Sequence, residues 1–297
     1  MSAKAWTKEE LNFLKENYKT MTVSEIADKL GRTKCAIQLK ANKNGLKREE
    51  KYHYDKNYFE NISTPNQAYW LGFFYADGYV TKGETNAEAA IELQKSDAGH
   101  LRKLNKCLGG NIEVGFRKRG PQVIIDQPIG PSEVCFIRLY STKIVNDLIS
   151  HGCVQRKTFV KKAPSGVPDE LMRDFIRGYF DGNGSISSSY NKKVDKHYLK
   201  VAIETASDDF VNWLSDYLNE HGFANKILKD TFAWKLQLHA PANWKFIDYI
   251  YKDAEMYLDR KYQRYLSAVS GYNGKFGQIA LKGKIGEGLA ANSEVSA

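Results

Sequence analysis

Apolar positions in the first fifty residues recur at helical spacing, in three short stripes separated by polar turns. Thr7 and Glu10 precede the first stripe in a capping-box pattern, in which each residue caps a backbone amide of the other. Gly31 and Gly45 follow the second and third stripes, where glycine commonly ends a helix. The pattern predicts a three-helix domain over residues 1–50, with the last two helices arranged as a helix-turn-helix.

Long polar side chains cluster on and beside the third predicted helix. Residues 1–51 hold twelve lysines and arginines against seven acids, so they carry five of the nine net positive charges. A basic helix in this arrangement can enter a DNA groove, although a protein-interaction module with a solvated basic face has the same pattern. We favour DNA binding, with the candidate residues Arg32, Lys34, Gln38 and Lys40.

Two similar apolar segments mark an internal repeat further along the chain. Residues 70–80 read WLGFFYADGYV and residues 176–186 read IRGYFDGNGSI, at an offset of 106 positions. After each segment, the hydrophobic pattern predicts a strand pair, a helix, a second strand pair and a closing helix. The order αββαββα, present twice, predicts an α+β fold with repeats at 65–160 and 161–267. The expected strands are 79–80, 89–94, 111–116 and 134–140 in the first repeat and 185–187, 198–204, 226–228 and 232–238 in the second.

The segments on either side of the repeats lack a clear hydrophobic period. Residues 51–64 are polar with scattered tyrosines and are predicted to form a linker. Residues 268–297 are rich in Gly, Ala and Ser and are predicted to form a flexible tail.

Composition narrows the class of protein. Hydrophobic residues make up 42% of the chain, enough for folded cores, and a net charge of +9 suits an anionic partner such as DNA, RNA or an acidic membrane surface. The longest apolar run, residues 68–76, is too short to cross a bilayer. The four cysteines are too scattered for a zinc ribbon or a redox pair, so we expect reduced thiols in a cytoplasmic protein.

Small residues at four-residue spacing recur in both repeated segments. Gly72 and Ala76 share one helix face in the first segment, and Gly178 and Gly182 share one in the second. Small side chains let two helix backbones approach closely. We therefore expect the two segments to be helices that pack against each other through these four residues.

Such packing would bring the C-terminal ends of the two helices together. Asp77 ends the first helix and Asn183 ends the second, at positions that already carry partial negative charge. A carboxylate at that end is favourable if a cation lies between the helices, and hard divalent cations prefer oxygen ligands. A metal held there could activate water for phosphodiester cleavage.

The sequences WLGFFYADG and IRGYFDGNG resemble the two LAGLIDADG motifs of single-chain homing endonucleases, and residues 1–50 resemble the Myb/SANT-like helix-turn-helix domains of phage and mobile-element nucleases. The first resemblance covers residues 65–267 and is supported by IELQKSDAGHL at 91–101 and RKT at 156–158. It implies a saddle of two repeats whose sheets lie in the major groove of double-stranded DNA, in a monomer that acts as a pseudo-dimer. It also implies phosphodiester hydrolysis with Mg²⁺ or another divalent cation, and an intron, phage or other mobile element as the source.

The resemblance also implies roles for individual residues. Asp77 takes the position of the catalytic acid, and Gln94 that of a polar residue near the site. Asn183 takes the second catalytic and metal-binding position. The backbone carbonyls of Ala76 and Gly182 take the remaining metal-binding positions.

The second motif departs from the family pattern. Asn183 stands where an aspartate is expected, and Ala206 falls where the second repeat would match Gln94. Asp181 could substitute for the missing acid, but its helical position predicts a different direction. The departure favours an attenuated, nicking or inactive nuclease, and it leaves open a non-cleaving DNA-binding regulator or an RNA-intron maturase of the same fold.

Basic residues of the predicted strands and connections are candidates for contacts with phosphates or guanines. The strongest are a run at 117–119 and the connection at 191–196. The candidate set is Arg117, Lys118, Arg119, Arg138, Lys157, Lys192, Lys193, Lys196, Lys226 and Lys229, with Lys261 and Arg264 as further phosphate contacts.

Overall fold

The computed structural model describes residues 5–47, 52–83, 86–124, 127–155, 157–191, 193, 196–230 and 233–270. The chain divides into two compact units, Met1–His53 and Tyr54–Ala297. No helix in these described ranges is long and apolar enough to cross a membrane.

The first unit contains the three helices that the hydrophobic pattern predicts: α1 Lys8–Asn17, α2 Val23–Leu30 and α3 Lys34–Lys43. Capping boxes begin α1 and α2, because Thr7 and Thr22 each exchange hydrogen bonds with the glutamate three residues later. Gly31 ends α2 in the left-handed conformation, with φ of 59°, so α3 begins only three residues later. Leu14, Ile26 and Ile37 form the centre of its small core.

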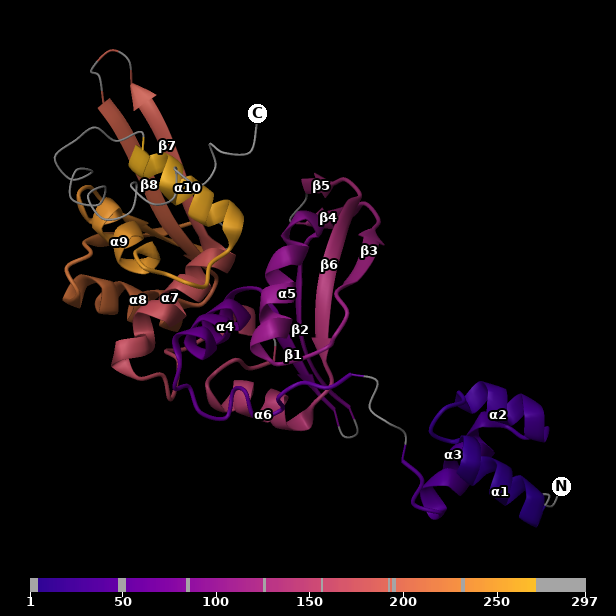
Figure 1. Cartoon of the computed structure of the whole chain (residues 1–297). Helices are drawn as coiled ribbons and strands as arrows, with labels where there is room; N and C mark the ends of the chain where they lie inside the picture. Colours follow the sequence, from indigo (N-terminus) through magenta and orange to yellow (C-terminus); the bar gives the residue numbers. More distant parts are fainter. Residues whose placement is uncertain are drawn as a thin grey trace, which may run out of the picture. The chain divides into compact units, whose positions relative to one another are not determined.

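The second unit contains two tandem repeats that share the order αββαββα, with further short elements in the first (Figure 1). The first repeat consists of α4 Pro65–Ala76, β1 Gly78–Lys82, β2 Ala87–Gln94, η1 Lys95–Asp97, α5 Ala98–Cys107, β3 Gly115–Arg119, β4 Gln122–Ile124, β5 Gln127–Ile129, β6 Ser132–Leu139, α6 Thr142–Ser150 and η2 Lys157–Phe159. The second consists of α7 Asp169–Asn183, β7 Gly184–Asn191, β8 Lys196–Thr205, α8 Asp208–Glu220, β9 Asn225–Lys229, β10 Trp234–Leu238, α9 Ala242–Tyr251 and α10 Asp259–Ser270.

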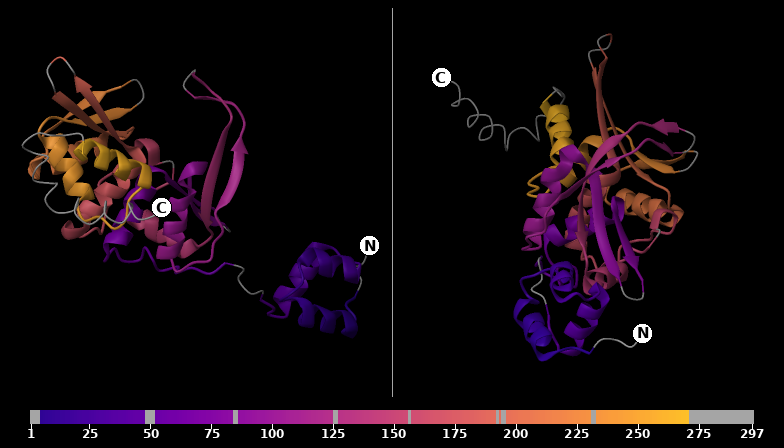
Figure 2. Two further views of the ribbon diagram at one scale, coloured as in Figure 1. Left: turned by 45° about the horizontal axis from the view of Figure 1, so that its top comes forward. Right: turned by 90° about the vertical axis from the view of Figure 1, so that its right-hand side faces the viewer.

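Each repeat builds an antiparallel four-stranded sheet with the same strand order. The orders are β1-β2-β6-β3 and β7-β8-β10-β9. Corresponding residues start each ladder, since Gly78 pairs with Ile91 and Gly184 pairs with Ile203. The prediction of an α+β fold with two αββαββα repeats is confirmed. Figure 2 shows that each sheet carries helices on one of its faces.

Two features of the first repeat differ from the sequence prediction. The strand expected at 111–116 begins later, as β3 at Gly115, because residues 111–114 form no ladder. A two-stranded hairpin of β4 and β5 lies between β3 and β6 and was not predicted. In the second repeat, β9 and β10 follow each other directly along the chain, with no hairpin between them among the described residues.

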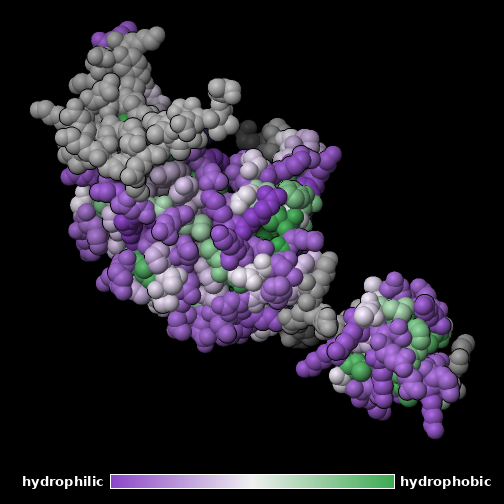
Figure 3. Space-filling model, viewed as in Figure 1, coloured by the Kyte–Doolittle hydropathy of each residue, from purple (hydrophilic) through white to green (hydrophobic). Residues whose placement is uncertain are grey.

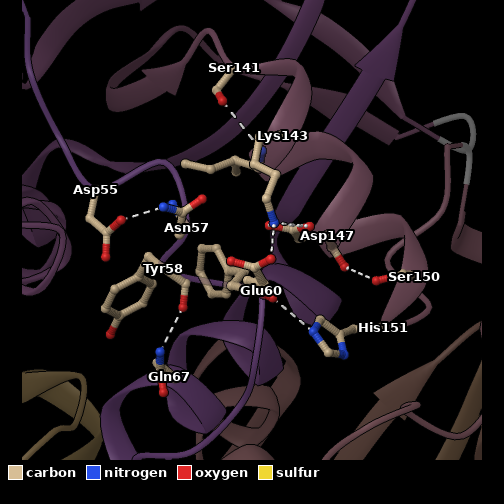
Figure 4. A network of polar contacts seen from close by, with 12 residues as sticks. Asp55, Asn57, Tyr58, Glu60, Gln67, Ser141, Lys143, Asp147, Ser150 and His151 are labelled. Carbon is tan, nitrogen blue, oxygen red and sulfur yellow. Dashed lines mark hydrogen bonds and ion pairs between the residues drawn. The ribbon is translucent and has the colours of Figure 1, made fainter.

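The segment predicted as a linker is packed onto the second unit from Asp55 onward (Figure 4). Phe59 is fully buried, with its ring 5.5 Å from that of Phe74. Its carbonyl oxygen lies 2.8 Å from Nε2 of His151, and Lys143 forms an ion pair with Glu60 at 3.3 Å. The prediction of a linker over 51–64 was therefore wrong for most of that segment. Its aromatic side chains are buried against the second unit and so hold the segment in place.

A helix that was not predicted, α10, ends the described chain. It extends to Ser270, so the first three residues of the expected tail at 268–297 are helical, and the rest lie outside the described residues. Its first turn is tied to the first repeat, because Asp259 forms an ion pair with Lys103 at 2.6 Å and Arg260 one with Asp97 at 3.0 Å. α10 therefore links the two repeats.

The helices α4 and α7 pack backbone against backbone at the centre of the second unit (Figure 1). A Cβ added to Gly72 would lie 2.0 Å from the carbonyl oxygen of Phe175. A Cβ added to Gly178 would lie 1.9 Å from the carbonyl oxygen of Tyr69. Glycine is required at both positions because any larger residue would separate the helices.

Replacement of Gly178 by alanine should therefore destabilise the protein by about 3 kcal/mol or more, the upper range for overpacking in a rigid core. Gly99→Ala is the matched control, because a Cβ on this glycine of α5 meets nothing within 4 Å. The control should raise stability by up to about 1 kcal/mol through helix propensity. Urea unfolding measures both changes, and equal effects of the two substitutions would contradict the close packing.

Candidate active site and nucleic-acid interface

Asp77 lies at the C-terminal end of α4, directly against α7. A Cβ added to Gly182 would meet the Ala76 side chain at 2.2 Å and the Asp77 Oδ2 at 3.2 Å. Among the described residues, none donates a hydrogen bond to this carboxylate. Burial raises the pKa of Asp77, and the nearby charges of Lys261, Lys157 and other basic residues oppose that rise. The carboxylate is thus available to a ligand at the junction of the helices.

Asn183, the last residue of α7, is directed toward its own helix. Its Nδ2 donates a hydrogen bond of 3.2 Å to the hydroxyl of Tyr179. The same hydroxyl accepts 2.9 Å from Nζ of Lys161 and donates 3.2 Å to the carbonyl of Glu204. The structure therefore places Asp77 and Asn183 at neighbouring helix ends but in different hydrogen-bonding environments.

Two buried lysines satisfy the carbonyl groups where the central helices pass into their first strands. Lys157 Nζ donates to the carbonyl of Gly78. Lys261 Nζ donates to the carbonyls of Phe180 at 2.8 Å and Gly182 at 3.4 Å, and also to that of Gly184. The carbonyl of Gly182 lies in the last turn of α7, where carbonyls lack partners inside the helix, whereas Gly78 and Gly184 begin β1 and β7. Both lysines were predicted as phosphate contacts, and their hydrogen bonds give them a structural role as well.

The residues at the helix ends fit one divalent cation better than two. Asp77 offers a carboxylate and Ala76 a carbonyl, and Mg²⁺ commonly combines one or two protein ligands with water and phosphate oxygens. The carbonyl of Gly182 already accepts from Lys261, and the Asn183 amide is hydrogen-bonded to Tyr179. No group of three His, Cys, Asp or Glu residues able to hold a metal occurs in the described parts of the chain. Of the four predicted ligands, Gly182 and Asn183 thus already have protein partners, whereas no described residue donates a hydrogen bond to the Asp77 carboxylate.

Gln94 is connected to the second repeat through a buried carboxylate. Its Nε2 donates 3.1 Å to Oδ2 of Asp97, which also accepts 3.0 Å from Nε of Arg260. The strand registers make Ala206 the residue that corresponds to Gln94 in the second repeat. Sequence reasoning missed Asp97 and Arg260, although RK at 156–157 recurs as RK at 260–261.

Asp181 does not replace the missing acid. Its carboxylate is fully buried and accepts hydrogen bonds from Tyr69 at 2.7 Å, Tyr251 at 2.6 Å and the amide of Leu258 at 2.7 Å. Tyr69 belongs to the other repeat, so this network joins α4 to α7. The role of Asp181 is to connect the repeats.

The solvent-facing side of the first sheet carries arginines paired with glutamates. Arg117 and Arg119 both bind Glu92, the former at 2.6 Å, and Arg138 lies 3.5 Å from Glu88. Lys118 pairs in register with Glu133, and alternation along the strand places it on the other face. The predicted run at 117–119 is therefore split between the two faces.

The second sheet divides its lysines in the same way. Lys226 pairs with Gln237 on the solvent-facing side, whereas Lys229 lies over the ring of Trp234 at 5.1 Å, on the other face. Lys193 is exposed in the connection between β7 and β8. Lys192 and the side chain of Lys196 lie outside the described residues. On the face drawn in Figure 3, hydrophilic residues cover most of both units.

In the first unit, Arg32 forms contacts within the domain. Its guanidinium forms a 2.8 Å ion pair with Glu10 and stacks on Trp6 at 4.3 Å, and its side chain is 7% exposed. Lys40 lies 5.5 Å from the same indole ring. Lys34 and Gln38 remain exposed on α3. The prediction that Arg32 faces a ligand is thus not supported by its placement, because its charge is already paired.

Comparisons with known proteins agree with this architecture. Residues 170–239 match the LAGLIDADG-like domain, so the second repeat carries such a domain. Over 70 residues the chain is 31% identical to the reverse gyrase of Methanocaldococcus jannaschii, a match that covers 24% of this chain and 4% of that protein.

Several solved homing endonucleases are similar in structure. The homing endonuclease I-WcaI, bound to its DNA recognition sequence, has a TM-score of 0.50 at 11% identity, over 71% of this chain and 91% of that chain. The meganuclease I-SmaMI, bound to uncleaveable DNA, has a TM-score of 0.45 at 16% identity, over 71% and 89%. Mesophilic variants of I-DmoI have a TM-score of 0.40 at 16% identity, over 62% and 93%. The likeness to I-WcaI shows the fold.

The buried Lys161 should make stability depend on pH. Burial lowers its pKa to about 8 from the ordinary 10.5, so between these values the folded protein binds fewer protons than the unfolded chain. The penalty on the charged lysine is present below pH 8 and is relieved as the pH rises. Lys161→Met removes it, and the variant should exceed the wild type by about 2–3 kcal/mol at pH 7, with the difference closing toward pH 10.5.

Urea unfolding of both proteins between pH 7 and 10.5 measures this difference. Lys245→Met, at an exposed position of α9, is the control and should follow the wild type at every pH. Parallel curves for Lys161→Met and the wild type would show that Lys161 carries no such penalty.

Proposed function

We propose that the protein is a site-specific endonuclease of the LAGLIDADG type that binds double-stranded DNA and hydrolyses one strand. The observation that supports the proposal most is that the C-terminal ends of α4 and α7 carry different side chains in different hydrogen-bonding environments. Asp77 presents a carboxylate that no described residue binds, whereas Asn183 is uncharged and hydrogen-bonded to Tyr179. Two equivalent catalytic ends would cut both strands, and one competent end cuts one.

Double-stranded DNA would lie across the two sheets. Both sheets offer exposed Arg and Lys next to Glu, a mixture able to contact phosphates and to read guanine and cytosine. I-WcaI, with the same fold, is bound to its DNA recognition sequence in the solved structure. A monomer suffices for this mode of binding, because each repeat supplies one sheet and the pair acts as a pseudo-dimer. We place its action on cytoplasmic DNA and propose a mobile element as its source.

The chemistry would be centred on Asp77. A bound divalent cation, with Mg²⁺ as the proposed one, lowers the pKa of water and neutralises charge on the scissile phosphate. Asp77 would supply the negative charge that holds the cation, and the Ala76 carbonyl would complete the protein's share of ligands. Lys157 and Lys261 favour the ionised form of Asp77, which burial alone would disfavour. Gln94, exposed at the end of β2 and hydrogen-bonded to Asp97, would orient a water or a phosphate oxygen.

The first unit would add affinity through α3. Its short connection to α2 is that of a helix-turn-helix, and Lys34 and Gln38 are exposed on the helix that enters the groove in such domains. We therefore propose a DNA-binding role like that of the Myb/SANT-like domains for residues 1–50.

The second candidate function is DNA binding without cleavage. The hydrogen bond of Asn183 to Tyr179 favours it, because the second helix end is occupied by protein contacts. Such a protein would act as a regulator.

Strand cleavage distinguishes the two candidates. A supercoiled plasmid library with Mg²⁺ should be converted to the open-circular form by the wild type and left unchanged by Asp77→Asn, because the charge at the competent end is lost. Asn183→Asp should produce some linear product by restoring the second acid. Gel electrophoresis of the plasmid forms is the readout.

Three results would contradict one-strand cleavage. Linear product from the wild type would show two competent ends. Binding without nicking by all three proteins would favour the regulator, and binding to structured RNA alone would favour an intron maturase.

The role of α3 has its own test. Lys34→Ala should reduce the slope of log binding constant against log salt concentration by about 1, because one phosphate contact is lost. Lys19→Ala, at an exposed position outside α3, is the control and should keep the slope. Identical slopes for all three proteins would remove α3 from the DNA interface.

A further inference from the structure

A pocket of about 270 Å³ opens beside Asn183, on the side of the second repeat. Three alanines widen it, and one of them, Ala206, corresponds to Gln94 of the first repeat. Its lining includes Lys157, Lys161, Asn183 and Glu204.

Two buried lysines of this pocket have neutral hydrogen-bond partners. Lys157 and Lys161 are 9% and 4% exposed. The Nζ of Lys157 donates to the carbonyl of Gly78, and that of Lys161 donates to the hydroxyl of Tyr179. Neither has an ion pair with a described carboxylate. A buried ammonium without a counter-ion is unfavourable, so both pKa values are lowered by burial.

The acidic groups nearby do not cancel this charge. Glu204 lines the pocket, but its carboxylate forms an ion pair with Lys235 at 3.0 Å. Asp77 interacts electrostatically with Lys261, Lys157, Arg260 and Lys161, so a single carboxylate is shared among four basic residues. The side chain of Asn183 adds no negative charge, and its amide donates to Tyr179.

We propose that this pocket is an anion site that takes a phosphate group, with Lys157 and Lys161 as its cations and Asn183 as its neutral wall. The proposal rests on the proposed DNA binding for its natural occupant, a phosphodiester of the strand that is not cut. That phosphate is bound by the ammonium groups of the two lysines, whereas the phosphate at Asp77 is bound through a divalent metal cation. An aspartate at position 183 would repel it, which gives Asn183 a function of its own.

The first measurement is thermal unfolding in EDTA, with inorganic phosphate compared with chloride at equal ionic strength. Phosphate should raise the Tm of the wild type and of the control Lys245→Met more than it raises that of Lys161→Met. In chloride, Lys161→Met should melt at or above the wild-type temperature, because a buried charge is removed. Asn183→Asp, which leaves both lysines in place, should also lose the specific phosphate shift.

The second measurement identifies the source of the phosphate. In EDTA, Lys161→Met should reduce the salt slope of duplex binding by about 1 relative to the wild type and Lys245→Met. Loss of the phosphate shift with an unchanged slope would support an anion site that takes free phosphate. Equal phosphate shifts in all proteins, or a Lys161→Met variant that melts below the wild type in chloride, would overturn the proposal. Since no cleavage occurs in EDTA, these results do not depend on the nicking activity.

Discussion

The backbone contact between α4 and α7 is the constraint on which the rest of the second unit depends. Gly72 and Gly178 each leave room for a carbonyl oxygen of the opposite helix, at a distance where a methyl group could not fit. Helices this close end side by side. The strands that follow each helix begin at once, at Gly78 and Gly184, so both sheets start from this common point.

Bringing two helix ends together concentrates partial negative charge and unpaired carbonyls, and the chain compensates for both. Lys157 and Lys261 donate to these carbonyls from corresponding places in the two repeats. Both repeats thus use a lysine in the same way, but the residues that end their central helices differ. The first repeat ends its helix in Asp77, a carboxylate close to these lysines, and the second ends its helix in the uncharged Asn183, which is hydrogen-bonded to Tyr179. We therefore propose that divergence of a duplicated half-site has converted one metal-binding end into an end suited to phosphate.

The parts of the structure that follow from local periodicity could be predicted from the sequence. Caps such as Thr7 and small-residue spacing such as Gly178 and Gly182 are local signals, and the repeat order followed from the hydrophobic pattern after each repeated segment. The packed segment around Phe59 could not be predicted, because the polar composition of residues 51–64 is typical of a linker. Nothing in that composition indicates that the ring of Phe59 is buried. The structural role of Arg32 depends on Glu10, which lies 22 positions earlier, and no short-range pattern reveals such a pair.

The sequence identified the residues of the candidate site better than it identified the contacts that each of them makes. Asp77 and Asn183 lie at neighbouring helix ends, as the repeat offset indicated, but the partner of Asn183 depends on the direction of its side chain. Strand register decides which face Lys118 and Lys229 occupy, and a register cannot be read from an isolated basic run. The lysine-lined pocket is formed by segments distant in sequence and had no local signal.

The central claim is that the two helix ends differ in their ability to hold a cation. Crystals of the protein bound to a selected DNA duplex in Mn²⁺ would test it through anomalous diffraction. We predict one manganese peak at the Asp77 carboxylate and none at the Asn183 amide. Two manganese peaks of equal height, one at each helix end, would contradict the account.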